Sequence, residues 1–240
     1  MGKQGGSEGG SVSYEVYRSK RKTCVIAVTA DGRVEVRAPL WMEDTAIQAL
    51  MASKASWIER HLVEMDARNS QYVNIGLQDG QVLPLLGANR TVRSVGDGRP
   101  RITESEILLP RPCSVSRGQM VETLYRQAAR VHLANRTAQL AGESGYQYAR
   151  VKINGARTRW GSCSTAGNLN FSWLLILVEP HLVDYVILHE LCHTKYMNHS
   201  QSFWGEVALH MPDYRQRRER LRQEQGQIIY LYNLVQNDKG

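Results

Sequence analysis

The strongest constraint on this chain is the stretch 189–204, which reads HELCHTKYMNHSQSFW. Positions i and i+4 of an α-helix lie on one face about one turn apart, so His189 and His193 can present two imidazoles to a single ion. Glu190 lies about 100° further round such a helix, where its carboxylate can reach a water on that ion without being a ligand. The stretch therefore predicts a helix that carries a metal site.

The spacing is the H-E-x-x-H arrangement of zinc hydrolases. His199, six residues past His193, is the predicted third ligand, because three neutral imidazoles leave a fourth position of zinc open to water. The chain must turn back through Tyr196 to bring His199 to the ion, and Asn198 at positive φ is one way to make that turn. The alternatives for His199 are a helix-capping or surface role, with an acidic residue as the third ligand.

These residues predict one Zn²⁺ per chain and hydrolysis of a peptide or protein substrate. Glu190 would take a proton from water as general base and later pass it to the leaving amine. Arg159 and Trp160 are candidate substrate contacts, although an arginine that pairs with a carboxylate to brace the chain is an equal alternative for Arg159. Two non-catalytic alternatives stay open. The two histidines could be hydrogen-bonded inside the core without a metal, or a metal could be present that only stabilises the fold.

The composition leaves a second function open. The chain has 240 residues, a formal net charge of +7 and a pI of about 9.3, and its basic residues gather at 18–22 and 215–222. Nucleic acid is therefore a candidate partner, either for a protease of DNA-bound proteins or for a DNA-binding module with a structural metal. A helix with interleaved Arg and Glu is, however, more often a solvated face.

Targeting and redox signals are few. No apolar run of about 18 residues is present, so we expect no membrane span. The four cysteines are scattered without a C-x-x-C pair, which is typical of reduced thiols in a cytoplasmic protein. Residues 1–12 are rich in Gly and Ser without an apolar core, so we expect a flexible lead-in and no secretory signal.

The hydrophobic pattern predicts an α+β chain with an N-terminal β-rich region at 13–115 and a core at 116–240. In the first region we expect antiparallel strands at 13–19, 23–29 and 33–37, a helix at 43–66 with a possible break near 53–56, and a second antiparallel unit at 82–86, 89–95, 101–102 and 106–109. In the core we expect helices at 117–142, 180–196, 200–210 and 213–225, strands at 149–153 and about 168–176, and an apolar tail at 227–235. The helix 180–196 is apolar nearly all round, which predicts a central and buried element.

Several segments together resemble the YgjP-like metallopeptidase family, a zincin-type group. They are RTRWGSCS at 157–164, NLNFSWLL, Glu179-Pro180, HELCHTKYMNHSQSFW, the basic run 18–22, DGRVEVRAP at 31–39 and KASWI at 54–58. The resemblance implies a zincin-like α+β core, with a central metal-binding helix packed on a small antiparallel sheet. It also implies a metal on His189, His193 and His199 and a catalytic carboxylate on Glu190. Similar motifs occur in SprT- and WLM-type proteases, which act on DNA-bound proteins.

Overall fold

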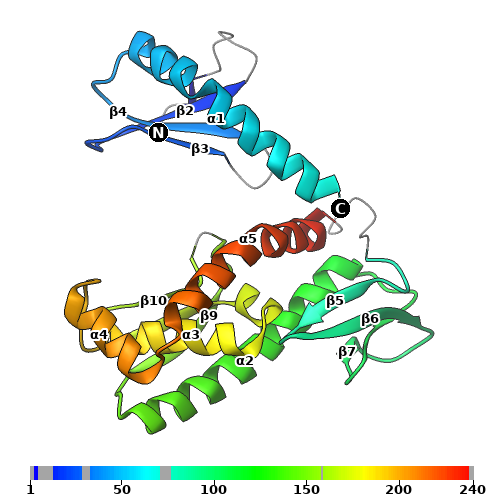
Figure 1. The fold of residues 1–240 in the computed structure, drawn as a ribbon. Helices are drawn as coiled ribbons and strands as arrows, with labels where there is room; N and C mark the ends of the chain where they lie inside the picture. The colour runs from blue at the N-terminus through cyan, green and yellow to red at the C-terminus, as the bar shows by residue number, and fades with distance from the viewer. Residues whose placement is uncertain (1–2, 5–12, 29–32, 71–76, 158, 238–240) are drawn as a thin grey trace. The chain divides into compact units, whose positions relative to one another are not determined.

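A computed structural model describes residues 3–4, 13–28, 33–70, 77–157 and 159–237 (Figure 1). The chain forms two compact units, 1–74 and 75–240. Five α-helices and three small sheets in the described residues confirm the predicted α+β class. The Asp31-Gly32 turn and most of the predicted lead-in lie outside the described residues. No helix in the described part is long and apolar enough to cross a membrane.

The first unit is a mixed four-stranded sheet with one helix. The strands run in the order β1-β2-β4-β3, with bounds Lys3–Gln4, Tyr14–Ser19, Val34–Pro39 and Val25–Val28. The prediction of an all-antiparallel sheet is wrong here, because β2 and β4 pair in parallel, with Tyr14 opposite Val34. The inward side chains of β4, Val34, Val36 and Ala38, are almost fully buried. The most deeply buried strand of the sheet is therefore the central one, between β2 and β3, and the predicted hairpin order is not formed.

Helix α1, Asp44–Ser70, covers this sheet without interruption. Ile47, Met51 and Ile58 are buried in the core that α1 shares with the strands. The predicted break near 53–56 is absent, because the Ser53 hydroxyl donates to the Leu50 carbonyl and stays within the helix. Trp57, in the middle of the helix, is 37% exposed.

The second unit begins with a sheet in the order β5-β6-β8-β7, with bounds Val82–Leu85, Ala88–Val95, Glu106–Pro110 and Arg101–Ile102. The prediction of an antiparallel unit is wrong for β6 and β8, which are parallel. Ile107 and Leu109 of β8 are fully buried, so this strand lies inside the sheet and the two-residue β7 lies at its edge. The turn between β5 and β6 is Leu86-Gly87, both at positive φ. Its Leu86 amide donates to the Ile176 carbonyl at 2.7 Å.

Helix α2, Arg117–Ser144, begins with a capping box between Ser116 and Gln119 and ends at Gly145, which has φ 74°. It agrees with the predicted helix 117–142, although Val131, predicted to face the core, is 58% exposed. The boundary expected near residue 115 lies inside the second unit. Leu83, Val92, Ile107 and Leu109 of the preceding sheet share one core with α2 and the later helices.

A third sheet has the order β10-β11-β9, with bounds Gly161–Cys163, Asn168–Ser172 and Arg150–Asn154. Strand β11 is antiparallel to β10, but it is parallel to β9, so the small sheet is mixed and not antiparallel as expected. The predicted return strand to about 176 stops at Ser172, since the Ser172 hydroxyl accepts from the Leu174 amide and caps a short 3₁₀ helix, Trp173–Leu177.

Helix α3, Pro180–Cys192, runs through the middle of the second unit between α2 and α5 (Figure 1). It is buried on almost every side, as predicted, and Pro180 occupies its first turn. The predicted end at 196 is wrong. The helix ends at Cys192, because the amides of Thr194 and Lys195 bond to the carbonyls of Leu191 and Cys192 and tighten the chain into turns.

Helices α4, Gln201–His210, and α5, Tyr214–Asn237, complete the second unit. The prediction that Gly226 ends α5 is wrong, because the helix continues through it. A helical glycine costs about 1 kcal/mol relative to alanine. Burial of Ile228, Leu231 and Val235 beyond it contributes about 1.5–3 kcal/mol per side chain and outweighs that cost. The predicted apolar tail is therefore the second half of α5.

Candidate metal centre

Three imidazoles meet at the end of α3. His189 lies in its last turn, His193 caps it, and His199 directly precedes Ser200, the N-cap of α4. One ring nitrogen from each lies within 4.8 Å of the others, and the Nε2 atoms of His189 and His199 are 3.0 Å apart. The structure thus brings together the three histidines that the sequence grouped. The return turn does not use Asn198 at positive φ, since Leu86 is the only described non-glycine residue with that backbone.

The backbone fixes how His193 faces the cluster. Its Nδ1 is 2.9 Å from the Tyr196 carbonyl oxygen, which can only accept, so Nδ1 carries the proton and donates it. The Nε2 lone pair of His193 is then free, as a metal ligand requires. The turn through Tyr196 therefore both returns the chain and orients the second histidine. The sequence predicted a turn through Tyr196, but it did not predict that the Tyr196 carbonyl would accept a hydrogen bond from His193.

Electrostatics favour the neutral forms of His189 and His199. Burial, with the neighbouring His193, His199 and Arg218, lowers the pKa of His189 to about 3. Burial, His193 and Arg218 also lower the pKa of His199. Neutral imidazoles whose lone pairs converge repel one another unless a cation lies between them. Nitrogen ligands of tetrahedral zinc lie about 3.3 Å apart, close to the 3.0 Å between His189 and His199. The residues present therefore fit a divalent metal ion.

Aromatic rings of α4 hold two of the imidazoles. Phe203 stacks on His193 with ring centroids 4.4 Å apart, and Trp204 stacks on His199 at 5.5 Å. Phe203 is fully buried and Trp204 packs in turn on Tyr214 at 5.3 Å. The inward direction of Phe203 and Trp204 was predicted, but their contact with the histidines depends on how α4 folds back on α3.

Glu190 lies beside the cluster and is almost completely buried, with 6% of its surface exposed. Burial raises the pKa of Glu190 to about 7, against the opposing charge of Arg159. A Cβ atom on Gly161 would lie 2.7 Å from both Cγ and Oε1 of Glu190. Gly161, expected only to break the chain between two strands, is the first residue of β10 and leaves room for the carboxylate. No local signal in the sequence points to that contact.

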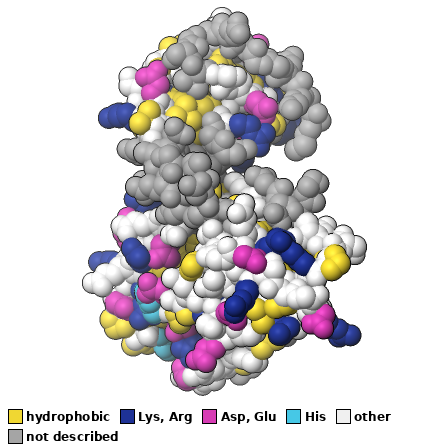
Figure 2. Space-filling view, turned by 90° about the vertical axis from the view of Figure 1, so that its right-hand side faces the viewer, with side chains coloured by type: hydrophobic (Ala, Val, Ile, Leu, Met, Phe, Trp, Pro, Cys, Tyr) yellow, Lys and Arg dark blue, Asp and Glu magenta, His cyan; other side chains and the backbone are white. Residues whose placement is uncertain are grey.

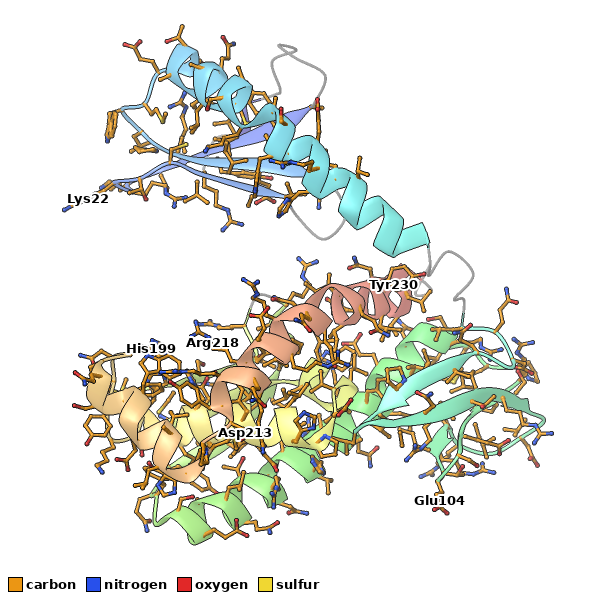
Figure 3. The ribbon with its side chains drawn as sticks, viewed as in Figure 1. Lys22, Glu104, His199, Asp213, Arg218 and Tyr230 are labelled. Atoms are coloured by element: carbon orange, nitrogen blue, oxygen red, sulfur yellow. The ribbon has the colours of Figure 1, made fainter. Side chains whose placement is uncertain are left out.

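A pocket of about 500 Å³ opens over His189 and Glu190. Arg159 and Trp160, the predicted substrate contacts, line it with Gly161 at the start of β10. Sequence reasoning missed several further lining residues, Tyr185 and Arg218 among them. Tyr185 lies four residues before His189 and so on the same helical face, a signal that was present in the sequence. Arg218 reaches the pocket from α5, which only the tertiary fold can show (Figure 3).

The other histidines and cysteines near the cluster have partners of their own. His181 pairs with Glu179 at the start of α3, and Cys163 donates to the Ser164 carbonyl. Cys192 is buried and lies 3.4 Å from the Tyr146 hydroxyl. His210 packs edge-on against Tyr146. None of these residues belongs to a metal-binding group of three in the described part of the chain.

Three converging imidazoles beside a buried carboxylate at a cleft are the side chains that a metal-dependent hydrolase requires. The chain belongs to the YgjP-like family, since that family's metallopeptidase-domain model matches residues 22–224. The family implies a metal cofactor and a protein substrate, and the match gives no support to binding of nucleic acid.

Two other comparisons add little. No curated protein matches the chain. A crystal structure of a metallopeptidase zymogen, abylysin of Pyrococcus abyssi, is similar at 22% identity over 38% of this chain and 93% of that one, with a TM-score of 0.35. The family assignment rests on the sequence match alone.

Proposed function

We propose that this protein is a zinc-dependent peptidase in which His189, His193 and His199 hold the ion and Glu190 is the general base. The observation that carries the proposal is the convergence of three imidazole nitrogens within 4.8 Å beside a buried carboxylate. We further propose that α3, β10 and β11 form a zincin-like core, in which a strand lies along the cleft beside the metal helix. Arg159 and Trp160 are the proposed substrate contacts on that wall.

Each residue has a defined task in this scheme. A zinc ion held by the three imidazoles acts as a Lewis acid and lowers the pKa of water. Glu190 accepts the proton of the attacking water and then donates it to the leaving amine, so one carboxylate serves as base and then as acid. A carboxyl with a pKa near 7 is suited to both tasks at neutral pH. Arg159 lowers that pKa, and a cation on the histidines would lower it further.

The test separates metal binding from catalysis. Elemental analysis should find about one zinc per chain, and His193→Ala should lose it. Glu190→Gln should keep the zinc and the fold but lose roughly 10²–10⁴ in rate on a peptide library, the usual contribution of a general base. His181→Ala is the matched control, since His181 lies on the same helix but outside the cluster, and it should keep both metal and activity.

A fully active Glu190→Gln variant would show that the base is another group. Zinc retained at full occupancy by His193→Ala would remove His193 from the ligand set.

A further inference from the structure

The pocket over the candidate metal centre is lined by four arginines and by two glutamates, Glu190 and Glu219. Arg215, Arg218 and Arg222 of α5 lie at i, i+3 and i+7, so they share one helical face, and all three line the pocket with His189 and Glu190. Arg159 lines it from the strand side. Figure 3 shows Arg218 beside His199, and Arg218 is close enough to lower the pKa of that histidine.

The other arginines of α5 do not share this position. Arg217 binds Asp213 at 2.8 Å and the His181 carbonyl, and Arg220 binds Glu224 at 2.8 Å. Neither lines the pocket. Arg217 and Arg220 are thus paired outside the pocket, whereas Arg215, Arg218 and Arg222 line it.

The cleft arginines keep their charge available. The guanidinium of Arg218 lies over the Trp204 ring at 5.1 Å and that of Arg215 over Tyr214 at 5.6 Å. Contact with a ring leaves N–H groups of a guanidinium for an acceptor. In Arg215 the Nε–H donates to the Tyr214 hydroxyl at 3.1 Å, so its terminal N–H groups are the ones that remain. Within the described residues, Arg159, Arg215 and Arg218 have no ion pair with a carboxylate, whereas Arg222 has an exposed one with Glu219 at 3.4 Å. Trp204 and Tyr214 hold two of the three unpaired cations in place.

We propose that this pocket selects acidic peptides, with a substrate Asp or Glu side chain close to the scissile bond bound by Arg218 and Arg215. The proposal rests on the peptidase function proposed above and adds a substrate class to it. A planar guanidinium donates two parallel N–H groups to one carboxylate, which makes arginine the suited residue for such selection. Because the pocket is open to solvent, the preference should weaken as ionic strength rises.

The experiment compares two fluorogenic peptides that differ only by Glu or Gln beside the scissile bond. The ratio of kcat/KM for the Glu over the Gln peptide should be roughly tenfold in the wild-type protein, as expected for a charge-assisted hydrogen bond discounted for solvent. Arg218→Gln should bring this ratio close to one, and Arg215→Gln should lower it. Arg220→Gln is the matched control: it removes the same charge from the same helix outside the pocket and should leave the ratio unchanged.

Binding gives a second readout that does not need cleavage. Anisotropy of the labelled peptides with the zinc-loaded Glu190→Gln variant should show tighter binding of the Glu peptide, and adding Arg218→Gln should abolish the difference. Cleavage of both peptides with equal kcat/KM overturns the substrate class and leaves the peptidase function standing. If the wild-type protein binds the Glu peptide selectively but cleaves neither peptide, the peptidase function is overturned and the preference for acidic peptides stands. A single-stranded oligonucleotide that binds more tightly than the Glu peptide, and does so through Arg218, also overturns the proposal.

Discussion

Gly161 lacks a side chain at the one place where β10 passes the carboxylate of Glu190. An added Cβ would approach Cγ, Oε1 and Cδ of Glu190 to between 2.7 and 2.9 Å, which is closer than such atoms pack. Its backbone does not have the positive φ that explains many other glycines. Space for the Glu190 side chain, and not backbone freedom, is therefore the requirement at this position.

Gly161→Ala should displace the Glu190 side chain and lower kcat roughly 100-fold, because misplacement by about 1 Å has that effect on a positioned group. The zinc content should stay at about one per chain, since the three histidines are untouched. Gly142→Ala is the control, because its added Cβ meets nothing within 4 Å. Steady-state kinetics and elemental analysis on both variants check the prediction, and wild-type kcat in Gly161→Ala would refute it.

At the scale of single residues, the sequence predicted what helical periodicity dictates. The shared face of His189 and His193, with Glu190 beside them, follows from spacing alone. His199 could be grouped with them, but its path could not, since the turn depends on backbone hydrogen bonds to Leu191 and Cys192. Contacts between residues distant in sequence, such as Gly161 with Glu190, have no periodic signal at all.

Helices α2 and α3 are joined by one bidentate ion pair. Arg136 donates from Nε to one oxygen of Asp184 at 2.6 Å and from a terminal nitrogen to the other at 2.8 Å. The side chains are only 27% and 19% exposed, and the interaction raises the pKa of Arg136. Arg136 thus lies at the edge of the interface between α2 and α3.

Arg136→Lys should lower the free energy of unfolding by about 1–2 kcal/mol, because an ammonium group cannot reproduce the two parallel hydrogen bonds. The same change at Arg93, whose pair with Glu106 is 66% exposed on the arginine side, should cost under about 0.5 kcal/mol. Urea denaturation of both variants measures the difference. Equal losses in the free energy of unfolding at the two positions would mean that the Arg136–Asp184 pair contributes no more to stability than an exposed ion pair.

Acid should weaken the attachment of the β5–β8 sheet to α2. Hydrogen bonds from Arg117 and Ser94 lower the pKa of Asp79 to about 2, whereas an unfolded Asp has a pKa of about 3.9. The folded state therefore binds fewer protons here, so this contribution is complete above about pH 4 and is lost as pH falls toward 2. In the metal-free protein, Asp79→Asn should reduce the loss of stability between pH 5 and pH 2, measured by urea denaturation. An identical pH dependence in both proteins would exclude Asp79 as a contributor.

The types of elements could be predicted better than their pairing. Strands β2, β4, β6, β8, β9 and β11 lie where alternation placed strands, yet β2–β4, β6–β8 and β9–β11 are parallel pairs. Short connections favour antiparallel neighbours, and the pattern of one strand does not show that a later strand will be inserted beside it. The continuation of α5 through Gly226 was missed for a similar reason, since the burial that stabilises it is tertiary.

Across the whole molecule, zinc should stabilise the two compact units unequally. All three histidines belong to the unit 75–240. At a free zinc concentration of 100 Kd, binding adds about 2.7 kcal/mol to folding, or roughly 5–10 °C in Tm for a unit of this size. Hydrogen exchange should slow in peptides from 75–240 when zinc replaces a chelator, and stay unchanged in peptides from 13–70. His193→Ala should remove the effect, and equal protection of both units would contradict the prediction.

The net charge of the chain is +7, but on the face shown in Figure 2 the Lys and Arg side chains lie among Asp and Glu side chains. Within the basic segment 18–22, Arg18 is engaged by Asp44 and by the Met42 carbonyl, so it braces the first unit. Arg217 and Arg220 of the second basic segment are likewise paired within their own helix. These arginines are therefore engaged in local ion pairs, and the positive net charge does not by itself favour a polyanion as partner.

The Leu86-Gly87 turn limits the positions at which a peptide can be inserted into this protein without damage to the fold. Tips of hairpins usually tolerate peptide tags, because they end in solvent. This tip does not: Leu86 bonds to the carbonyl of Ile176, and a Cβ on Gly87 would lie 3.1 Å from Pro180, the first residue of the metal helix. The turn around Gly96 has open space around it. A reporter or affinity tag thus has a safe insertion point at one end of β6 and a damaging one at the other.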